Sequence, residues 1–418
     1  MDFATRNLIV RILFISHYFP PEVNAPASRT HEHCRKWADD GHDITIITGV
    51  PNHPTGQLFR GYKNRFLQEE QVDGIRVIRT WMLLASNAGF AKRILNFILF
   101  ALMSVVASFK VKDPEVVIAT SPQFFCGLAG AAVAKIKRRP FILEVRDLWP
   151  KSIVELDQLG EGPILRFLEW LERRMYHSAD GIVVNTRAFV DHIGQLDYPS
   201  DRIEIVYNGI DPDLFKPQPP SNELRARFDL EGRFCVGYLG TLGLAHGLQT
   251  LLEAAEALRS QPEIVFLLIG DGAEKKKLES IVRERKLRNV RLIGLQPREM
   301  MPAWIATTDI LIVTLRDLPV FETVIPSKIF EFLAQERPVI VAARGEIRSM
   351  TEASNVALTI DPEDPGALVG AIQQIRNEPE SARERAKAGS SWVEENFVRT
   401  ELAMKMLDFV EKCVERTR

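Results

Sequence analysis

Short runs of Val, Ile and Leu alternate with stretches of helical periodicity along almost the whole chain. Runs that are apolar throughout are typical of parallel strands buried on both faces. The first half contains seven of them, at residues 10–16, 42–50, 74–81, 114–121, 140–147, 181–186 and 203–209. The second half contains six, at residues 234–240, 264–272, 290–295, 309–315, 337–343 and 356–361. This rhythm predicts an α/β chain with two doubly wound, Rossmann-like domains.

A polar, Pro-rich segment, "DPDLFKPQPPSNE" (211–223), separates the two halves and is typical of a linker. We therefore expect an N-terminal domain at 1–210 and a C-terminal domain at 211–395. Residues 396–418 follow as an amphipathic helix, because their apolar positions recur at helical spacing. Doubly wound sheets bind ligands at the carboxyl ends of their strands, so two such domains are expected to face a central cleft.

Composition narrows the class of protein further. A chain of 418 residues exceeds a single hydrophobic core, and its net charge of -2 predicts no nucleic-acid partner. Its cysteines lack metal-ligand spacing and are expected to be reduced thiols of a cytosolic protein; they are Cys34, Cys126, Cys235 and Cys413. The start "MDFATRNLIV" does not resemble a signal peptide, so we expect a cytoplasmic protein.

One apolar stretch suggests a membrane surface. Residues 94–109 carry no charge, but they are shorter than the roughly 20 residues of a spanning helix. Between residues 92 and 139 there are eight basic residues against two acidic ones. An apolar helix flanked by cations suits the anionic inner face of the cytoplasmic membrane. A buried core helix with basic ends fits the same residues. A second stretch, 164–176, is a weaker candidate for membrane contact, and ordinary packing is the favoured interpretation of it.

A charged pair stands out in "IPSKIFEFLAQERPVI" (325–340). A capping box from Ser327 would need an acid at Phe330, so Glu331 is one residue too late. Lys328 and Glu331 could instead be a surface pair, or a ligand site in which the lysine and helix amides bind phosphate. These residues alone leave the choice open. No GxGxxG, P-loop or HExxH motif occurs, which disfavours a dehydrogenase.

Several motifs in order carry a family resemblance: "SHYFPPEVNAPASR", "ATSPQFFCGLAG", "EVRDLWPKS", "YNGIDPDLF", "GYLGTLGLAHGL", "LIGDG" and "IPSKIFEFLAQERPV". With them the chain resembles the family-four retaining glycosyltransferases of the GT-B fold. It is most similar to bacterial transferases that add N-acetylfucosamine-type sugars to polyprenyl-diphosphate-linked acceptors for O-antigen or capsule. The resemblance implies a hexosyltransferase with a UDP-sugar donor, a lipid-linked acceptor, and neither cofactor nor metal. It also implies that "DPD" (211–213) is a turn.

The resemblance also implies site residues. Those expected to bind the nucleotide sugar are Gly240, Thr241, His246, Gly270, Asp271, Arg316, Ser327, Lys328 and Glu331. Those expected at the acceptor are Asn24, Ala25 and Arg29, and the catalytic candidates are Arg146, Asp147 and Glu322.

The sequence departs from the family pattern at three places. Glu322 stands one residue before the usual glutamate position, Thr241 and His246 replace an arginine and a lysine, and Arg146 replaces a histidine. Arg146 and Asp147 could equally form an ion pair at a strand end. Two other functions fit the same fold: a UDP-sugar epimerase and a catalytically silent partner subunit.

Overall fold

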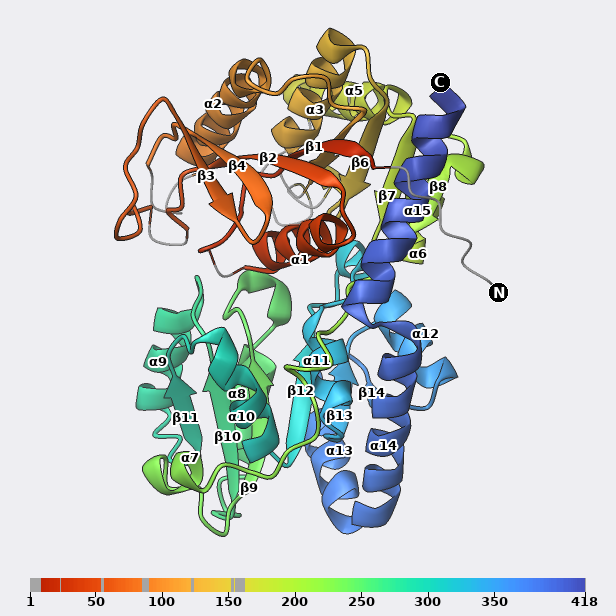
Figure 1. Cartoon of the computed structure of the whole chain (residues 1–418). Helices are drawn as coiled ribbons and strands as arrows, with labels where there is room; N and C mark the ends of the chain where they lie inside the picture. The colour runs from red at the N-terminus through yellow and green to blue at the C-terminus, as the bar shows by residue number, and fades with distance from the viewer. Residues whose placement is uncertain are drawn as a thin grey trace. The chain divides into compact units, whose positions relative to one another are not determined.

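The computed structural model describes residues 9–22, 24–53, 56–84, 90–121, 124–151, 154 and 162–417, without the side chains of residues 90 and 91. Val23, Pro122, Gln123 and Ser152, which belong to the quoted motifs, lie outside the described residues. The chain divides into two compact units (Figure 1). The first unit comprises Met1–Tyr207 with Arg399–Arg418, and the second comprises Asn208–Val398. Each unit is described by itself.

The first unit is built on an eight-stranded sheet with the order β3-β4-β2-β1-β5-β6-β7-β8. Its strands are β1 (Arg11–Ile15), β2 (Asp43–Gly49), β3 (Leu67–Val72), β4 (Ile75–Thr80), β5 (Val116–Thr120), β6 (Phe141–Val145), β7 (Gly181–Val184) and β8 (Ile203–Ile205). All neighbours are parallel except β3 and β4. The strand order reverses between β1 and β5, as in doubly wound sheets.

The sequence did not predict the edge strand β3, whose residues LQEEQV lack an apolar run. An edge strand that is half exposed does not need one. Asp73 and Gly74 join it to β4 with φ values of 48° and 79°. Two consecutive positive φ angles suit a two-residue hairpin turn, and Asp-Gly is a favoured pair there.

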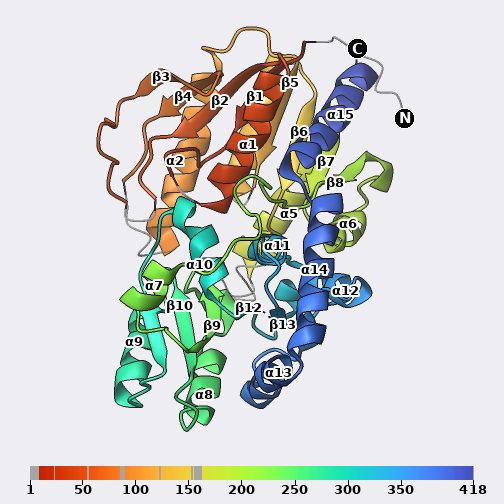
Figure 2. The same ribbon diagram turned by 60° about the horizontal axis from the view of Figure 1, so that its bottom comes forward.

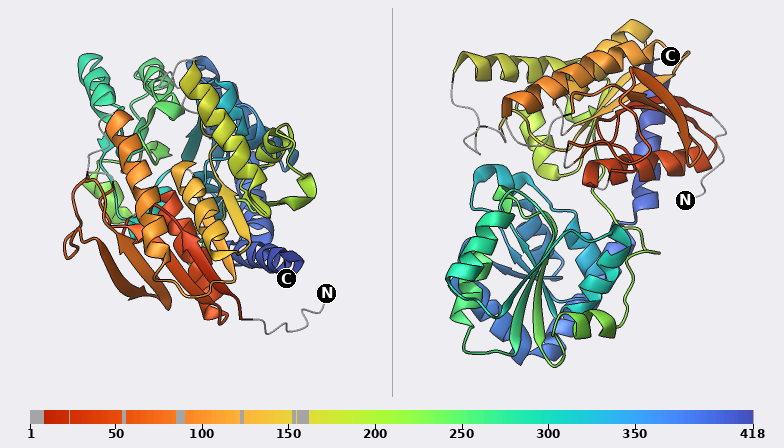
Figure 3. Two further views of the ribbon diagram at one scale, coloured as in Figure 1. Left: turned by 90° about the horizontal axis from the view of Figure 1, so that it is seen from above. Right: turned by 90° about the vertical axis from the view of Figure 1, so that its left-hand side faces the viewer.

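Helices cover both faces of the first sheet, as Figures 1 and 3 show. On one face lie α2 (Phe90–Ser108), α3 (Phe124–Lys137) and α5 (Pro163–His177). On the other, α1 (Ala25–Asp39) and α15 (Arg399–Thr417) lie side by side (Figure 2). The indole of Trp37 on α1 donates to the carbonyl of Ala403 on α15 at 2.8 Å. The unit also contains α6 (Arg187–Gly194) and the short η1 (Ser200–Arg202).

The second unit has a six-stranded, fully parallel sheet with the order β11-β10-β9-β12-β13-β14. Its strands are β9 (Phe234–Leu239), β10 (Ile264–Ile269), β11 (Val290–Ile293), β12 (Ile310–Thr314), β13 (Val339–Ala342) and β14 (Leu358–Ile360). In chain order this is the 3-2-1-4-5-6 arrangement, with the reversal between β9 and β12. The two Rossmann-like units confirm the predicted fold class.

Helices lie on both sides of this second sheet as well (Figure 3, right). They are α7 (Asn222–Arg227), α8 (Gln249–Ala257), α9 (Lys275–Glu284), α10 (Met301–Thr307), α11 (Lys328–Ala334), α12 (Glu346–Ala353), α13 (Pro365–Asn377) and α14 (Pro379–Asn396). Short 3-10 turns are η2 (Leu244–His246), η3 (Arg298–Met300) and η4 (Pro319–Thr323). Side chains of α8, α9 and α13 share one buried apolar cluster with the sheet, and α11 packs against α14.

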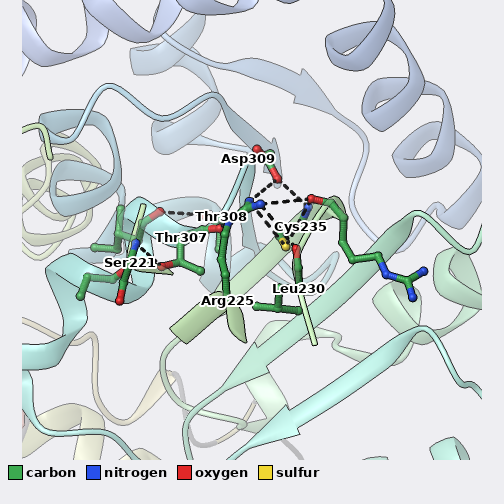
Figure 4. Close-up of polar contacts among 10 residues, drawn as sticks. Ser221, Arg225, Leu230, Cys235, Thr307, Thr308 and Asp309 are labelled. Carbon is green, nitrogen blue, oxygen red and sulfur yellow. Dashed lines mark hydrogen bonds and ion pairs between the residues drawn. The ribbon is translucent and has the colours of Figure 1, made fainter. Parts of the chain in front are cut away.

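A polar cluster fixes the start of the second unit (Figure 4). The Asp309 carboxylate accepts from the backbone N–H of Cys235 at 2.7 Å and from the Arg225 guanidinium at 3.2 Å. Arg225 also donates to the Thr307 carbonyl at 3.2 Å. These contacts tie α7 to the amino ends of β9 and β12, opposite the carboxyl ends at which ligands of doubly wound sheets bind.

Candidate active site

In the second unit, three adjacent strands bring candidate residues to one edge of the sheet. Gly240 follows β9, Gly270 follows β10, and Arg316 lies two residues after β12. Because β9 lies between β10 and β12, these positions meet where the strand order reverses. Ligands of doubly wound sheets bind at this place.

Two glycines let the loops after β9 and β10 touch. Gly240 has φ 137° and Gly270 has φ 146°, both in the region that side chains disfavour. A Cβ atom on Gly270 would lie 1.9 Å from the carbonyl oxygen of Gly240, so only glycine fits there. Beyond this contact, the N–H of Leu242 donates to the Asp271 carbonyl at 2.9 Å. The two predicted glycines therefore shape the loop that begins at Gly240.

Lys328, the first residue of α11, reaches this loop. A Cβ atom on Gly240 would lie 3.1 Å from its Nζ, and the Nζ lies 3.8 Å from the centre of the Tyr238 ring. The Nζ is buried and has no hydrogen-bond partner in the part of the chain that the structure describes. Burial lowers the pKa of Lys328 to about 7, although the charge of Glu331 opposes the shift. The site therefore holds a partly desolvated ammonium that a phosphate could bind.

His246 lies close to Tyr238, with ring centres 5.8 Å apart. Its Nδ1 is 3.2 Å from the carbonyl oxygen of Thr314. Because a carbonyl only accepts, Nδ1 carries the proton. Burial, and then the charge of Lys328, lower the pKa of His246 to about 3. His246 is therefore neutral at physiological pH and does not supply the positive charge that an arginine or lysine would bring.

The start of α11 has no capping hydrogen bond from Ser327. Ser327 precedes the helix as its N-cap residue, with φ -57° and ψ -27°, and its side chain makes no capping hydrogen bond. Glu331 instead interacts electrostatically with Lys328, one turn before it on the same helix. The interpretation of the pair as a capping motif is therefore excluded, and a role for Glu331 at the ribose stays a prediction.

The remaining donor-site candidates make local contacts. The Asp271 carboxylate accepts from the Gly272 N–H at 2.8 Å and pairs with Lys275 at 3.1 Å. Arg316 is half-exposed, and its Nε lies 3.7 Å from the carboxylate of Glu363.

The other two candidates, Thr241 and Glu322, are exposed. The Thr241 carbonyl accepts from the Tyr238 hydroxyl at 2.7 Å. Glu322 lies on η4, and Gly345 approaches its backbone closely. A Cβ atom on Gly345 would lie 2.0 Å from the backbone carbonyl oxygen of Glu322.

In the first unit, Arg146 and Asp147 follow β6. The backbone N–H of Arg146 donates to the Ser121 hydroxyl, just after β5, at 2.8 Å. Burial lowers the pKa of the Arg146 guanidinium to about 10, against the attraction of Glu144. Its Nε and Nη1 are buried and have no hydrogen-bond partner among the described residues. Asp147 lies close enough to Tyr176 to raise the pKa of that hydroxyl, after the larger effects of burial and Glu172.

The predicted acceptor residues lie on α1. The Asn24 side chain caps the helix by accepting from the Ala27 N–H at 2.9 Å, and Ala25 is its first residue. Arg29 is buried, and its Nε donates to Glu144 at 2.7 Å. Its other nitrogens donate to the carbonyls of Val206 and Tyr207 at 2.8 and 2.7 Å. Arg29 thus holds the end of the first unit, and an acceptor role for it stays a prediction.

The "DPD" segment is a turn, as predicted. The Asp213 N–H donates to the Asp211 side chain at 3.0 Å, and the N–H of Phe215 donates to the Asp211 carbonyl at 2.9 Å. Within the described ranges, no group of three or more His, Cys, Asp or Glu residues could hold a metal ion. The absence of a metal from the reaction stays a prediction.

Helix α2 has an inverted arrangement of polar and apolar residues. Its packed side includes Asn96, Phe100, Ser104, Ala107 and Ser108, whereas Leu95, Ile98, Leu102 and Val106 form an exposed stripe that continues to Phe109. Leu102 is 59% exposed and Phe109 66%. One side of the helix packs on the core, as the interpretation of a core helix expects, and membrane association stays a prediction. No helix in the described portion is long and apolar enough to cross a bilayer.

The expectation of ordinary packing for 164–176 is wrong for one side of α5. Ile164, Phe167 and Trp170 are at least half exposed. The rings of Phe167 and Trp170 stack at 5.9 Å, and the guanidinium of Arg174 lies 5.0 Å from the Trp170 ring. Helical periodicity alone did not distinguish the buried side of this helix from its exposed side.

Tyr238 is the site residue that the sequence analysis missed. It is buried at the end of β9 and contacts both Lys328 and the carbonyl of Thr241. The only signal was its place two residues before Gly240, inside a strand where an aromatic residue is expected in the core.

The fold and this glycine loop define a class of proteins with two Rossmann-like units and a candidate ligand site at the carboxyl ends of the strands, and comparisons with known families identify the family. Residues 24–209 match the family described as "Glycosyl transferase 4-like domain", and residues 221–392 match "Glycosyl transferases group 1". Together the two matches span most of both units. The chain therefore belongs to the family-four glycosyltransferases of the GT-B fold and is an enzyme of the hexosyltransferase type.

Among its relatives is WcaI of Escherichia coli (strain K12), assigned as a glycosyl transferase of colanic acid biosynthesis. The two are 26% identical, and the match covers 87% of this chain and 92% of WcaI. Sucrose-phosphate synthase from Thermosynechococcus elongatus superimposes with a TM-score of 0.77 at 18% identity, covering 96% and 98% of the two chains. Anabaena HepE in complex with UDP and glucose gives a TM-score of 0.70 at 16% identity, covering 96% and 99%. The two structures support the fold alone.

Proposed function

We propose that this glycosyltransferase moves a sugar from a UDP-sugar donor to a polyprenyl-diphosphate-linked acceptor in the synthesis of a bacterial surface polysaccharide. The observation that carries the donor part is the buried ammonium of Lys328 beside Gly240, at the reversal of strand order in the second unit. A desolvated cation next to open backbone is suited to a diphosphate. The similarity to WcaI supports a role in polysaccharide synthesis.

A UDP-linked donor is supported by HepE, whose structures hold UDP and UDP-glucose. In this proposal Lys328 binds the diphosphate, Arg316 adds a half-exposed cation, and Glu331 accepts from the two ribose hydroxyls. Carboxylates bind vicinal hydroxyls well because each of the two oxygens can accept a hydrogen bond from one hydroxyl. The transferred sugar that we expect is an N-acetylated deoxyhexose, and this expectation rests on the family resemblance alone.

The residues present suggest how the reaction proceeds. As the diphosphate leaves, negative charge grows on its oxygens and positive charge grows on the sugar ring. Donors that are already in place for the developing charge are the main source of rate enhancement. Lys328 stabilises the negative charge on the leaving diphosphate, and Asp147 orients the acceptor or stabilises the positive charge on the sugar ring. The acceptor attacks from the side that the diphosphate leaves, and a phosphate oxygen takes its proton, so the configuration is retained.

A lipid-linked acceptor requires a place at the inner face of the cytoplasmic membrane. The exposed apolar stripe of α2 supports this, because basic side chains flank it. The ammonium of Lys137 lies 5.8 Å from the Phe109 ring at the end of the stripe. On α5, Arg174 accompanies Trp170 in the same way. Apolar side chains with cations around them suit an anionic leaflet.

The decisive assay incubates the protein with candidate UDP-sugars, with and without a polyprenyl-diphosphate-linked sugar. Sugar transfer that depends on the acceptor supports the proposal. Conversion of the UDP-sugar without any acceptor would identify an epimerase, and binding without turnover would identify a silent partner subunit.

The same assay tests the metal-free mechanism. Because no three-residue metal site occurs among the described residues, we expect transfer to continue in EDTA at an unchanged rate. An absolute requirement for Mg²⁺ or Mn²⁺ after chelation would contradict this part of the proposal.

A further inference from the structure

The ammonium of Lys328 and the ring of Tyr238 have the geometry of a cation–π contact. The ammonium nitrogen lies 3.8 Å from the ring centre, well inside the roughly 6 Å at which a cation is attracted to a ring face. The ring itself is fixed, because Tyr238 is fully buried and its hydroxyl donates to the Thr241 carbonyl at 2.7 Å.

The ammonium depends on this ring because little else stabilises its charge. The Nζ is buried without a hydrogen-bond partner in the described part of the chain, and burying a charge is costly unless it is compensated. His246 on η2 is neutral. Glu331 on the same helix is the carboxylate that favours the charged lysine. Glu274, before α9, acts electrostatically on Tyr238, where its charge adds to the effect of burial in raising the pKa of the hydroxyl.

We propose that Tyr238 is a positioning residue for donor binding: its ring holds the Lys328 ammonium beside Gly240 and goes on stabilising the charge after the diphosphate of the donor has bound to it. The inference rests on the proposed function, because it concerns the same site. Gly240 leaves room for the ammonium because it has no side chain. A Cβ atom at this position would lie 3.1 Å from the Lys328 Nζ and would crowd it.

Binding of the donor should then be coupled to protonation of Lys328. The pKa of Lys328 is lowered to about 7 in the free protein, so near neutral pH only part of the population carries the charge. A bound diphosphate favours the charged lysine and raises this pKa. UDP binding therefore takes up protons above about pH 7, and UDP affinity falls as the pH rises from there toward the pKa of the complex.

The test changes the electrostatics of the ring without changing its size. Tyr238→Phe keeps the ring face, and a trifluorinated phenylalanine at the same position removes most of its negative potential. Calorimetry compares the binding of UDP and uridine, which lacks the phosphates, to each protein between about pH 5 and pH 9. The ionisation of UDP itself is common to all the proteins and cancels.

We expect Tyr238→Phe to bind UDP within about twofold of the wild type and the fluorinated protein to bind it about fivefold or more weakly. The affinity for uridine should be unchanged in both, and the decline of UDP affinity with pH should begin at lower pH in the fluorinated protein. In a Lys328→Ala background, fluorination should have no further effect, because the two changes then remove the same interaction.

Three results would overturn the inference: equal UDP affinity of the Phe and fluorinated proteins, a parallel loss of uridine binding, or an undiminished effect of fluorination in the Lys328→Ala background. A wild-type protein that binds neither UDP nor a UDP-sugar would instead refute the proposed function, so the two failures are distinguishable.

Discussion

At the scale of single residues, burial decides the protonation of the basic side chains in the candidate site more than the number of neighbouring charges does. Lys328 and His246 both lose affinity for protons chiefly because they are buried, and the charge of Lys328 adds to the effect on His246. For His246 this leaves a neutral ring, and for Lys328 it leaves a cation whose pKa lies near neutrality. The sequence identified both positions, but not their protonation, because the pKa depends on packing by residues distant in the chain.

Glu331 gives a prediction at this scale. If it accepts from the ribose, Glu331→Gln should weaken UDP binding about tenfold to a hundredfold, because hydrogen bonds to a charged group contribute about 1.5–3 kcal/mol. Thermal stability should change little, because glutamine has nearly the size of glutamate and Ser327 forms no capping hydrogen bond at this helix start. Calorimetric titration with UDP measures the first effect, and a melting curve the second. Turnover equal to that of the wild type at subsaturating donor would exclude the ribose role.

At the scale of elements, α1 joins the parts of the first unit that are most distant in sequence. Arg29 donates to the carbonyls of Val206 and Tyr207, where the chain leaves the unit. Glu32, one turn later, pairs with Arg399, where the chain returns. Side chains three residues apart share one side of a helix. One face of α1 therefore contacts both the segment where the chain leaves the first unit and the segment where it returns.

Removing the Arg29 side chain from this face of α1 should lower the free energy of unfolding substantially. The ion pair of Arg29 with Glu144 is nearly inaccessible, and loss of one partner of a buried pair typically costs about 3–5 kcal/mol. We expect Arg29→Ala to lower stability by this order in denaturant titration. Arg35→Ala on the same helix is the control, because its pair with Asp39 is exposed and should contribute under about 1 kcal/mol. Equal midpoints for the two variants would contradict this account of α1.

The Glu144 carboxylate also predicts a pH dependence. Burial alone would raise its pKa, but Arg29 and Arg146 outweigh burial and hold the pKa below its ordinary value. A lowered pKa in the folded state means that the stabilisation is present at neutral pH and is lost as the pH falls through the acidic range. The stability difference between the wild type and Arg29→Ala should therefore shrink in acid.

The exposed stripe on α2 gives the second element-scale prediction. Replacing Leu95 and Leu102 with Glu should release the protein from vesicles that contain anionic lipid, while the melting temperature stays close to that of the wild type, because both side chains are about half exposed or more. The matched control replaces Leu244 and Leu295, equally exposed leucines of the second unit, and should leave vesicle binding intact. A folded α2 variant that still sediments with vesicles would refute the membrane surface.

At the scale of the whole molecule, the repeated apolar runs predicted both sheets, because buried parallel strands have no polar face to obscure them. Strand β3 was missed since an edge strand paired on one side can be polar. The glycine loop and Lys328 were found through family motifs. The partner of Lys328 could not be predicted, because the contact with Tyr238 joins residues ninety positions apart and depends on how the first residue of α11 approaches the end of β9, next to the unusual φ of Gly240.

The central claim is that the second unit binds the nucleotide while Asp147 of the first unit acts on the reaction. The most direct test measures UDP affinity and the transfer rate together in Asp147→Asn and Lys328→Ala. An interaction made only in the transition state lowers turnover without weakening ground-state binding. We predict that Asp147→Asn binds UDP like the wild type but transfers sugar at least about a hundredfold more slowly, and that Lys328→Ala loses UDP affinity as well. Wild-type turnover by Asp147→Asn, or undiminished UDP affinity in Lys328→Ala, would contradict the account.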